Sequence, residues 1–221
     1  MAIDKSNTAP WVRVTLIILI VAFVLSFVAL SANPWQAFQA PKNTATAPTA
    51  TSLDAQFQPQ VASLTSLLQS DPTSYTALVS LGNVYFDWAV QKQQASQNST
   101  STMGADLPLW SAAKDAYARA VAVNPDESTV QVDYAITLFY TGDSNKAIEV
   151  GEAVLKKDAT FSPAWFNVAI FYQTVGEPAK AINAFEQYLK LDPKGATGGS
   201  PDFARSQIDT LKKSAATTST P

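Results

Sequence analysis

Apolar residues follow two patterns in this chain, one continuous and one periodic. The segment Val14–Leu30, VTLIILIVAFVLSFVAL, contains no charged residue and is apolar throughout except for one Thr and one Ser. As a helix it would be about 26 Å long, close to the ~30 Å hydrocarbon core of a bilayer. Trp11 and Trp35 bracket it, as aromatic residues at a membrane interface do. The pattern predicts one transmembrane helix within residues 11–32.

The orientation of this helix follows from the flanking charges. Lys5 and Arg13 precede the apolar run, and the next positive charge after it is Lys42. This asymmetry predicts that residues 1–10 are cytoplasmic and that the rest lies outside the cytoplasm, as in a single-pass protein of a bacterial cell membrane. A cleaved signal peptide is the alternative, but the run is longer than the ~7–15 apolar residues of such a signal.

The chain after the apolar run changes from irregular to periodic. Residues 33–52 are rich in Ala, Thr and Pro, which is typical of a flexible tether. From Leu53 onward apolar residues recur every three or four positions, which predicts a helix over residues 53–72. Pro59 is expected to kink this helix or to mark its first turn, and Asp71-Pro72 to end it.

Two later segments, beginning at Ala135 and Ala169, are alike at a constant offset of 34 residues. The matched pairs are Ala135 and Ala169, Gly142 and Gly176, Lys146 and Lys180, Ala147 and Ala181, and Ile148 and Ile182. In both, an apolar helical stretch runs to a Gly and a second helical stretch follows. Because Gly ends helices readily and small residues allow close packing, the repeated unit is predicted to be a helical hairpin.

These residues resemble the tetratricopeptide repeat, a family whose unit is a hairpin of 34 residues. Residues 162–195 match its signature at Trp165, Val168, Ala169, Tyr172, Gly176, Ala181, Phe185 and Pro193. Residues 128–161 match at Tyr134, Ala135, Leu138, Gly142 and Ala147 and depart at Gly151 and Ala159. Tyr188 stands where the family has Ala, which predicts a looser contact between hairpins there.

Residues 75–127 resemble a further repeat with an insertion. Leu81, Gly82 and Tyr85 match the signature of the first helix. The signature of the second helix follows late, at Ala113, Tyr117, Ala120 and Pro125. The insertion is polar and covers about residues 91–106, of which Ala95 to Gly104 are expected to form a loop.

The C-terminal end is predicted to cap the array. Residues 200–213 should form a helix with Ser200 as N-cap and Pro201 in the first turn. Its apolar residues, Phe203, Ile208 and Leu211, are expected to cover the last hairpin. The stretch GATGGS before it is expected to be a flexible turn and lacks the spacing of a phosphate-binding loop. Residues 214–221 are expected to be disordered.

The resemblance implies that the first helices of the hairpins line a groove. The residues that it places there are Asn83, Phe86, Val132, Ile136, Phe139, Tyr140, Phe166, Ile170 and Gln173. This largely apolar set favours binding of a protein or peptide partner, although burial by a neighbouring hairpin or by the inserted loop is the alternative for its members. Aromatic residues in place of Lys and Arg disfavour the clamp by which some family members hold acidic C-termini.

Composition excludes several kinds of site. The chain contains no Cys and no His, so disulfides, zinc–thiolate sites and imidazole chemistry are absent. Its formal net charge is −3, and no basic stripe is present that would bind nucleic acid. We expect neither enzymatic activity nor a cofactor, metal or small-molecule substrate.

Together these patterns predict an all-α protein: one N-terminal transmembrane helix, then an α-solenoid of three tetratricopeptide-like hairpins with a flanking helix at each end. The expected function is a membrane-anchored, extracytoplasmic interaction module. The resemblance to membrane-anchored repeat proteins makes it a scaffold or a chaperone-like assembly factor of the cell envelope. The alternative is a structural subunit whose membrane helix packs against other subunits of a larger complex.

Overall fold

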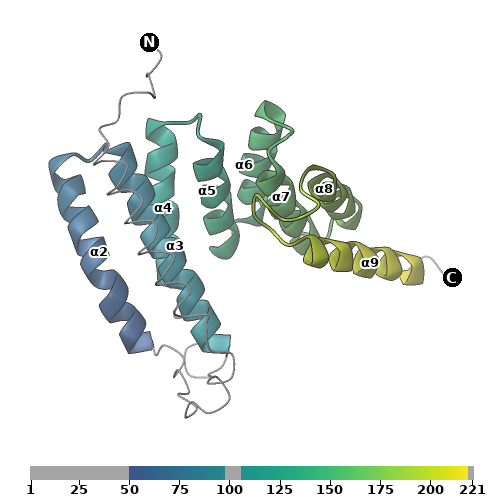
Figure 1. Cartoon of the computed structure of the whole chain (residues 1–221), viewed down its shortest axis with the longest axis horizontal. Helices are drawn as coiled ribbons and strands as arrows, with labels where there is room; N and C mark the ends of the chain where they lie inside the picture. Colours follow the sequence, from purple (N-terminus) through teal and green to yellow (C-terminus); the bar gives the residue numbers. More distant parts are fainter. Residues whose placement is uncertain (1–49, 98–105, 219–221) are drawn as a thin grey trace, which may run out of the picture. The chain divides into compact units, whose positions relative to one another are not determined.

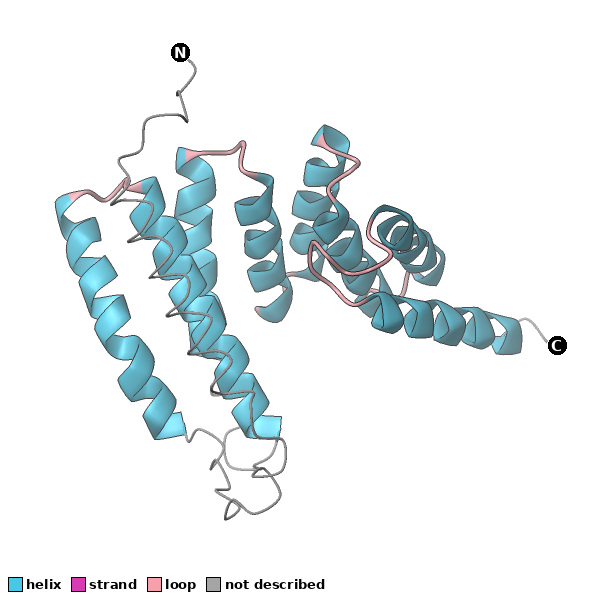
Figure 2. Cartoon of the chain, viewed as in Figure 1, coloured by secondary structure: helices cyan, strands magenta, loops and turns pink. Residues whose placement is uncertain are grey.

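The computed structural model describes residues 50–97 and 106–218, all within the compact unit Ala47–Pro221 (Figure 1). The predicted membrane segment and most of the predicted tether lie outside the described residues. Within those ranges every regular element is an α-helix (Figure 2). None of these helices combines the length and the hydropathy that crossing a membrane requires.

Eight helices follow one another in the described part of the chain, and each packs against the next (Figure 1). They are α2 (Ala50–Ser70), α3 (Tyr75–Gln97), α4 (Leu107–Val123), α5 (Ser128–Tyr140), α6 (Ser144–Lys157), α7 (Ser162–Thr174), α8 (Pro178–Leu191) and α9 (Pro201–Thr218). The pairs α3–α4, α5–α6 and α7–α8 are three consecutive helical hairpins, with α2 and α9 on either side. The prediction of an all-helical array of tetratricopeptide-like hairpins is confirmed.

The turn inside each of the last two hairpins is built in the same way. Gly142 and Gly176 have φ angles of 89° and 78°, a region that glycine enters at little cost. The amide of the next residue, Asp143 or Glu177, donates 2.9 Å back to the carbonyl of Leu138 or Tyr172. This hydrogen bond closes the end of the first helix, so the glycine pair found by the sequence offset marks the two turns.

The turns between hairpins share a different device. An Asp or Asn follows the second helix, and its side chain accepts a hydrogen bond from a backbone amide farther on. These residues are Asp71, Asn124, Asp158 and Asp192, with amides of Thr73, Asp126, Thr160 and Ala196 as donors. Because α2 ends in the same turn as α4, α6 and α8, it occupies the place of a second helix in the array.

The first hairpin is longer than its sequence pattern predicts. α3 continues to Gln97, so Ala95 to Gln97 are helical and not part of a loop. Just before this extension Lys92 attaches α3 to α2, since its Nζ lies 2.7 Å from the Asp54 carboxylate of α2 and over the Trp88 ring. Two of the three added residues, Ala95 and Gln97, are types with good helix propensity.

The two flanking helices also exceed their predicted bounds. α2 begins at Ala50 and contains Pro59 in its interior, so the tether is shorter than 33–52 and Pro59 does not mark the first turn. α9 runs to Thr218, which makes Ala215 and its neighbours helical where a disordered tail was expected. Alanine, which has the highest helix propensity, occupies two of the five added positions.

In the described residues the core lies between successive helices and consists of four clusters of buried side chains. Its fully buried side chains include Trp110, Tyr117, Phe171, Phe185 and Tyr188. The prediction of a loose contact at Tyr188 is wrong, because the side chain has no exposed surface and its ring lies 4.9 Å from that of Phe166. The ring fills space between α7, α8 and α9 that an Ala would leave empty.

Candidate functional site

A cleft of about 470 Å³ opens between α5 and α7, the first helices of the second and third hairpins. The wall from α5 consists of Thr129, Val132, Asp133 and Ile136. The opposite wall is formed by the turn from Asp158 to Phe161 and by Ser162, Pro163 and Asn167 of α7, and the segment Thr197–Gly199 closes one side. A cleft of this volume accommodates a few side chains or a small ligand.

The segment that closes the cleft is held in place by a buried carboxylate. Asp192 accepts hydrogen bonds from the backbone amides of Ala196 and Thr197, both at 2.8 Å, and from the Thr197 hydroxyl at 2.6 Å. The bonds from Thr197 are the main cause of a lowered pKa at Asp192. The hydroxyls of Thr197 and Ser162 also bond to each other, so the segment is attached to α7. The stretch GATGGS, expected to be a flexible turn, is therefore a fixed wall.

Gly199 shows why this wall needs a residue without a side chain. Its φ of 84° lies in the left-handed region, and a Cβ there would come within 2.8 Å of the Phe166 ring and 3.0 Å of the Tyr188 hydroxyl. The backbone thus lies directly on the aromatic side chains of α7 and α8. Any larger residue would move the wall outward.

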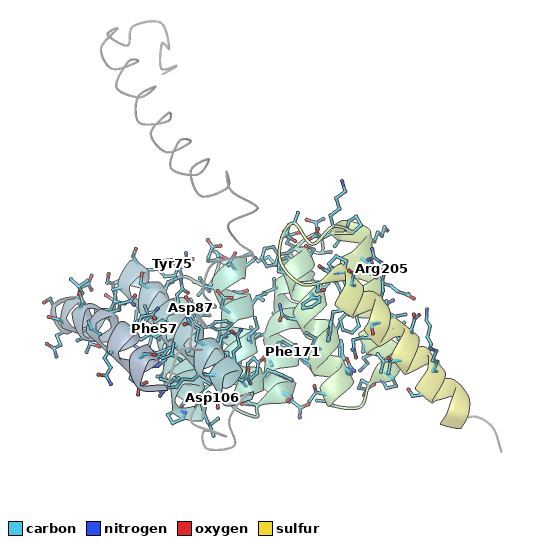
Figure 3. The ribbon with its side chains drawn as sticks, turned by 60° about the horizontal axis from the view of Figure 1, so that its bottom comes forward. Phe57, Tyr75, Asp87, Asp106, Phe171 and Arg205 are labelled. Atoms are coloured by element: carbon cyan, nitrogen blue, oxygen red, sulfur yellow. The ribbon has the colours of Figure 1, made fainter. Side chains whose placement is uncertain are left out.

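The α5 wall carries an unusual carboxylate. Burial, together with the charge of Asp87 on α3, raises the pKa of Asp133 to about 6. Asp87 is exposed and is labelled in Figure 3. Burial also raises the pKa of Tyr117 on α4, and the charges of Asp133 and Asp87 raise it further. The Tyr117 hydroxyl stays protonated and donates to Asn83 Oδ1 at 2.7 Å.

The opposite wall adds a second carboxylate and an amide. Thr160 donates from its hydroxyl and from its amide to Asp158 Oδ1, at 2.6 and 2.8 Å, and these bonds lower the pKa of Asp158. Asn167 donates from Nδ2 to the Pro163 carbonyl at 2.9 Å, which orients its side chain. The cleft therefore combines apolar side chains with carboxylate and hydroxyl groups on its walls.

The structure divides the nine predicted groove residues into three sets. The first set lies at the cleft: Val132 and Ile136 line it, and Asn83 bonds to the Tyr117 hydroxyl beside Asp133. Val132 is almost fully buried and Ile136 is half-buried, so Ile136 offers more surface to a ligand. Binding by these residues stays a prediction.

The second set belongs to a row of aromatic rings contributed by four helices of the array. Phe86 meets Trp110 edge-on at 5.0 Å, and Trp110 stacks on Tyr140 at 4.1 Å. Tyr140 touches Phe139, which stacks on Phe171 at 4.9 Å (Phe171 is labelled in Figure 3). These contacts join α3, α4, α5 and α7, so Phe86, Phe139 and Tyr140 give much of their surface to neighbouring helices.

The third set lies against the capping helix. Phe166 is 6.0 Å from Phe203 of α9, measured between ring centroids, and Gln173 Nε2 donates to Gln207 Oε1 at 2.7 Å. Ile170 packs on a core cluster that includes Ala204 of α9. These three residues are therefore covered within the protein, as the alternative interpretation of the groove residues allowed. The covering element is α9.

Several cleft residues were not among the sequence candidates. Asp133 is the one acidic residue of α5, and a lone carboxylate inside an otherwise uncharged helix was the available signal. The sequence contains no comparable signal for Thr129 or Asn167. The segment Thr197–Gly199 follows the last repeat, and its position against α7 depends on contacts that no local pattern contains. In the described part of the chain no group of acidic side chains is arranged to hold a metal ion.

Asp133 should make the protein less stable as the pH rises. Its pKa of about 6 in the folded protein exceeds the ordinary 3.8, so the folded state binds the proton more tightly. Stability from this group is complete below about pH 4 and is lost as the pH rises through about 6. Asp133→Asn should therefore raise the free energy of unfolding at pH 7 by about 1–2 kcal/mol, partial solvent contact reducing the full effect.

The measurement is urea denaturation of both proteins between pH 4 and pH 7. The difference between them should shrink towards pH 4, and Asp87→Asn should reduce it as well, because Asp87 contributes to the raised pKa. Tyr117 and Asp158 also lie in this region. Neither can cause a loss of stability between pH 4 and pH 7, because the pKa of Tyr117 is raised and that of Asp158 is lowered. A difference independent of pH would show that Asp133 is an ordinary surface carboxylate.

Comparison with known proteins matches one segment of this chain by sequence and most of the helical array by fold. Residues 162–194, which form α7 and α8, match the model of the tetratricopeptide repeat. A search of curated proteins finds no matching sequence. Among solved structures, one crystal structure of MamA protein superimposes with a TM-score of 0.52 at 18% identity, covering 72% of this chain and 79% of that one. A second crystal structure of MamA gives a TM-score of 0.52 at 17% identity, covering 75% of this chain and 92% of that one.

These likenesses agree with the geometry of the hairpins. The sequence match covers the third hairpin, and the structural matches extend over most of the helical array. The chain therefore contains a tetratricopeptide repeat at residues 162–194, within an array of helices that has the fold of that family.

Proposed function

We propose that this chain is a membrane-anchored interaction module that binds a segment of a partner polypeptide in the cleft between α5 and α7. The observation that carries the proposal is the cleft itself, with Val132 and Ile136 on one wall and polar groups around them. Apolar burial supplies affinity and the polar groups supply orientation. The tetratricopeptide fold is typically a scaffold for protein interactions, which supports a role without catalysis.

The membrane anchor in this proposal is argued from the amino-acid sequence. Val14–Leu30 has the length and composition of a membrane span, and Lys5 and Arg13 precede it. The tether after it would hold the helical array near the outer face of the membrane. Confinement to that surface raises the local concentration of the cleft for partners that are also membrane-bound.

The experiment is site-specific photocrosslinking in intact spheroplasts that express the full-length chain. Benzoylphenylalanine replaces Thr129, which is exposed at the edge of the cleft. The matched control is Thr76, which is the second residue of α3 as Thr129 is of α5 and which does not line the cleft. We expect a discrete adduct from position 129, none from position 76, and a severalfold lower yield when Ile136→Ala removes part of the apolar wall.

The same preparation tests the anchor. The chain should stay with the membranes after an alkaline carbonate wash, and added protease should digest the helical array in intact spheroplasts. Equal adduct yields from positions 129 and 76 would contradict binding in the cleft. So would an adduct yield from position 129 that Ile136→Ala leaves unchanged. Phe166 is unsuited to this test, because its contacts with Tyr188 and Phe203 make any loss of binding indistinguishable from loss of structure.

A further inference from the structure

The cleft carries negative charge that no basic side chain of the described residues neutralises. Asp133 and Asp158 line it, and none of its described lining residues is Lys or Arg. Asp87 adds charge next to Asp133. The closest lysine in sequence, Lys157, pairs instead with Asp126, its Nζ lying 2.6 Å from the carboxylate.

The apolar part of the cleft lies directly beside this charge. Asp133 neighbours Val132 on α5, and Ile136 lies almost one helical turn farther along the same wall. Phe161 supplies an aromatic edge from the opposite wall. An occupant therefore meets a carboxylate and an aliphatic surface a few ångströms apart.

Lysine and arginine are the side chains that satisfy both features, because each joins a flexible aliphatic stem to a positive end. We propose that the cleft binds a lysine or arginine of the partner polypeptide, with its charge on Asp133 and its stem on Val132 and Ile136. This inference rests on the proposed function and specifies the chemistry of the bound segment.

The electrostatics argue against an acidic partner. A carboxylate entering the cleft would meet Asp133, Asp158 and the nearby Asp87, and like charges brought together out of water repel strongly. A bound ammonium or guanidinium group would instead stabilise ionised Asp133. Binding of a basic segment should therefore strengthen as the pH rises from 5 to 7 and weaken with added salt. Asp87 on α3 and Tyr117 on α4 interact with Asp133, and Asp158 lines the same cleft from the turn before α7.

The test is a selection of random seven-residue peptides, displayed on phage, against the purified full-length chain in detergent micelles. Three proteins are compared: the unchanged chain, Asp133→Asn and the control Asp209→Asn, which alters an exposed carboxylate of α9. We expect Lys or Arg at a fixed position next to an apolar residue among peptides selected by the unchanged chain and by Asp209→Asn. Asp133→Asn should lose that preference while keeping its fold, since asparagine has nearly the same shape.

A selected peptide is then synthesised with its basic residue and with norleucine in its place. Removing either the basic group or the Asp133 charge should weaken binding about tenfold, as expected for one charged hydrogen bond. Asp133→Asn should cause no further loss with the norleucine peptide, because the two changes remove the same interaction.

The outcomes separate this inference from the proposed function. Peptides that bind the cleft without a basic residue, or with an acidic one, would overturn the inference and leave peptide binding intact. Independent losses from the two changes would also overturn it. Failure to select any peptide on any of the three proteins would overturn both.

Discussion

Replacing Trp110 with alanine is expected to lower the free energy of unfolding by about 3–5 kcal/mol, the usual range for removing a buried aromatic side chain. Trp110 is 1% exposed, stacks on Tyr140 and receives the edge of Phe86. Its Nε1 also donates to Asp106, at the start of α4. One substitution would therefore remove the ring that joins three helices.

Because each hairpin of a repeat array contacts only its neighbours, the damage should be local. The first hairpin is expected to lose hydrogen-exchange protection before the third does. Urea denaturation and hydrogen exchange measure the two effects. Leu107→Ala is the control, since Leu107 lies on the same helix and is 52% exposed, and it should change stability by less than about 0.5 kcal/mol. Equal destabilisation by both variants would mean that the aromatic row does not join the hairpins.

Gly151→Phe is expected to destabilise the protein by about 2–3 kcal/mol, although it installs the residue type found at the equivalent positions of the other hairpins. Those positions, 34 residues to either side, are Tyr117 and Phe185, and both side chains are buried. At Gly151 the space is already filled, because a Cβ there would clash with Cγ2 of Val168. Val168 is itself 1% exposed and β-branched, so it yields little.

The rescue of this variant tests the mechanism. Val168→Ala in the same chain should open room for the new ring and restore at least about 1 kcal/mol relative to the sum of the single changes. Ala153→Phe, on the exposed side of α6, is the matched control and should be nearly neutral. If Val168→Ala gives no rescue, the second and third hairpins do not meet through these two residues.

The sequence predicted the turns of this fold because each turn depends on a few local residues. Gly142 and Gly176 mark two turns through a conformation that glycine favours, and the Asp or Asn after each second helix closes the next turn with its own side chain. Helix ends without such a residue were predicted less well. α3 continues past its expected end to Gln97, and no capping residue or turn residue in the local sequence marks that position.

The candidate site was predicted in part for the same reason. The repeat pattern identifies which residues lie on the first helices, and it therefore found Val132 and Ile136. It does not say which of those residues another element covers, and Phe166, Ile170 and Gln173 lie against α9. Asp133 escaped notice because apolar periodicity ignores a single carboxylate, whose importance depends on burial and on the charge of Asp87.

The position of Thr197–Gly199 has a consequence for the length of the array. These residues come after the last repeat, yet they form one side of a cleft whose other walls belong to the second and third hairpins. A further hairpin inserted after α8 would displace them and open the cleft to solvent, whereas hairpins added before α2 would leave it untouched. The protein could thus gain repeats during evolution before α2 but not after α8, if the cleft is to be kept.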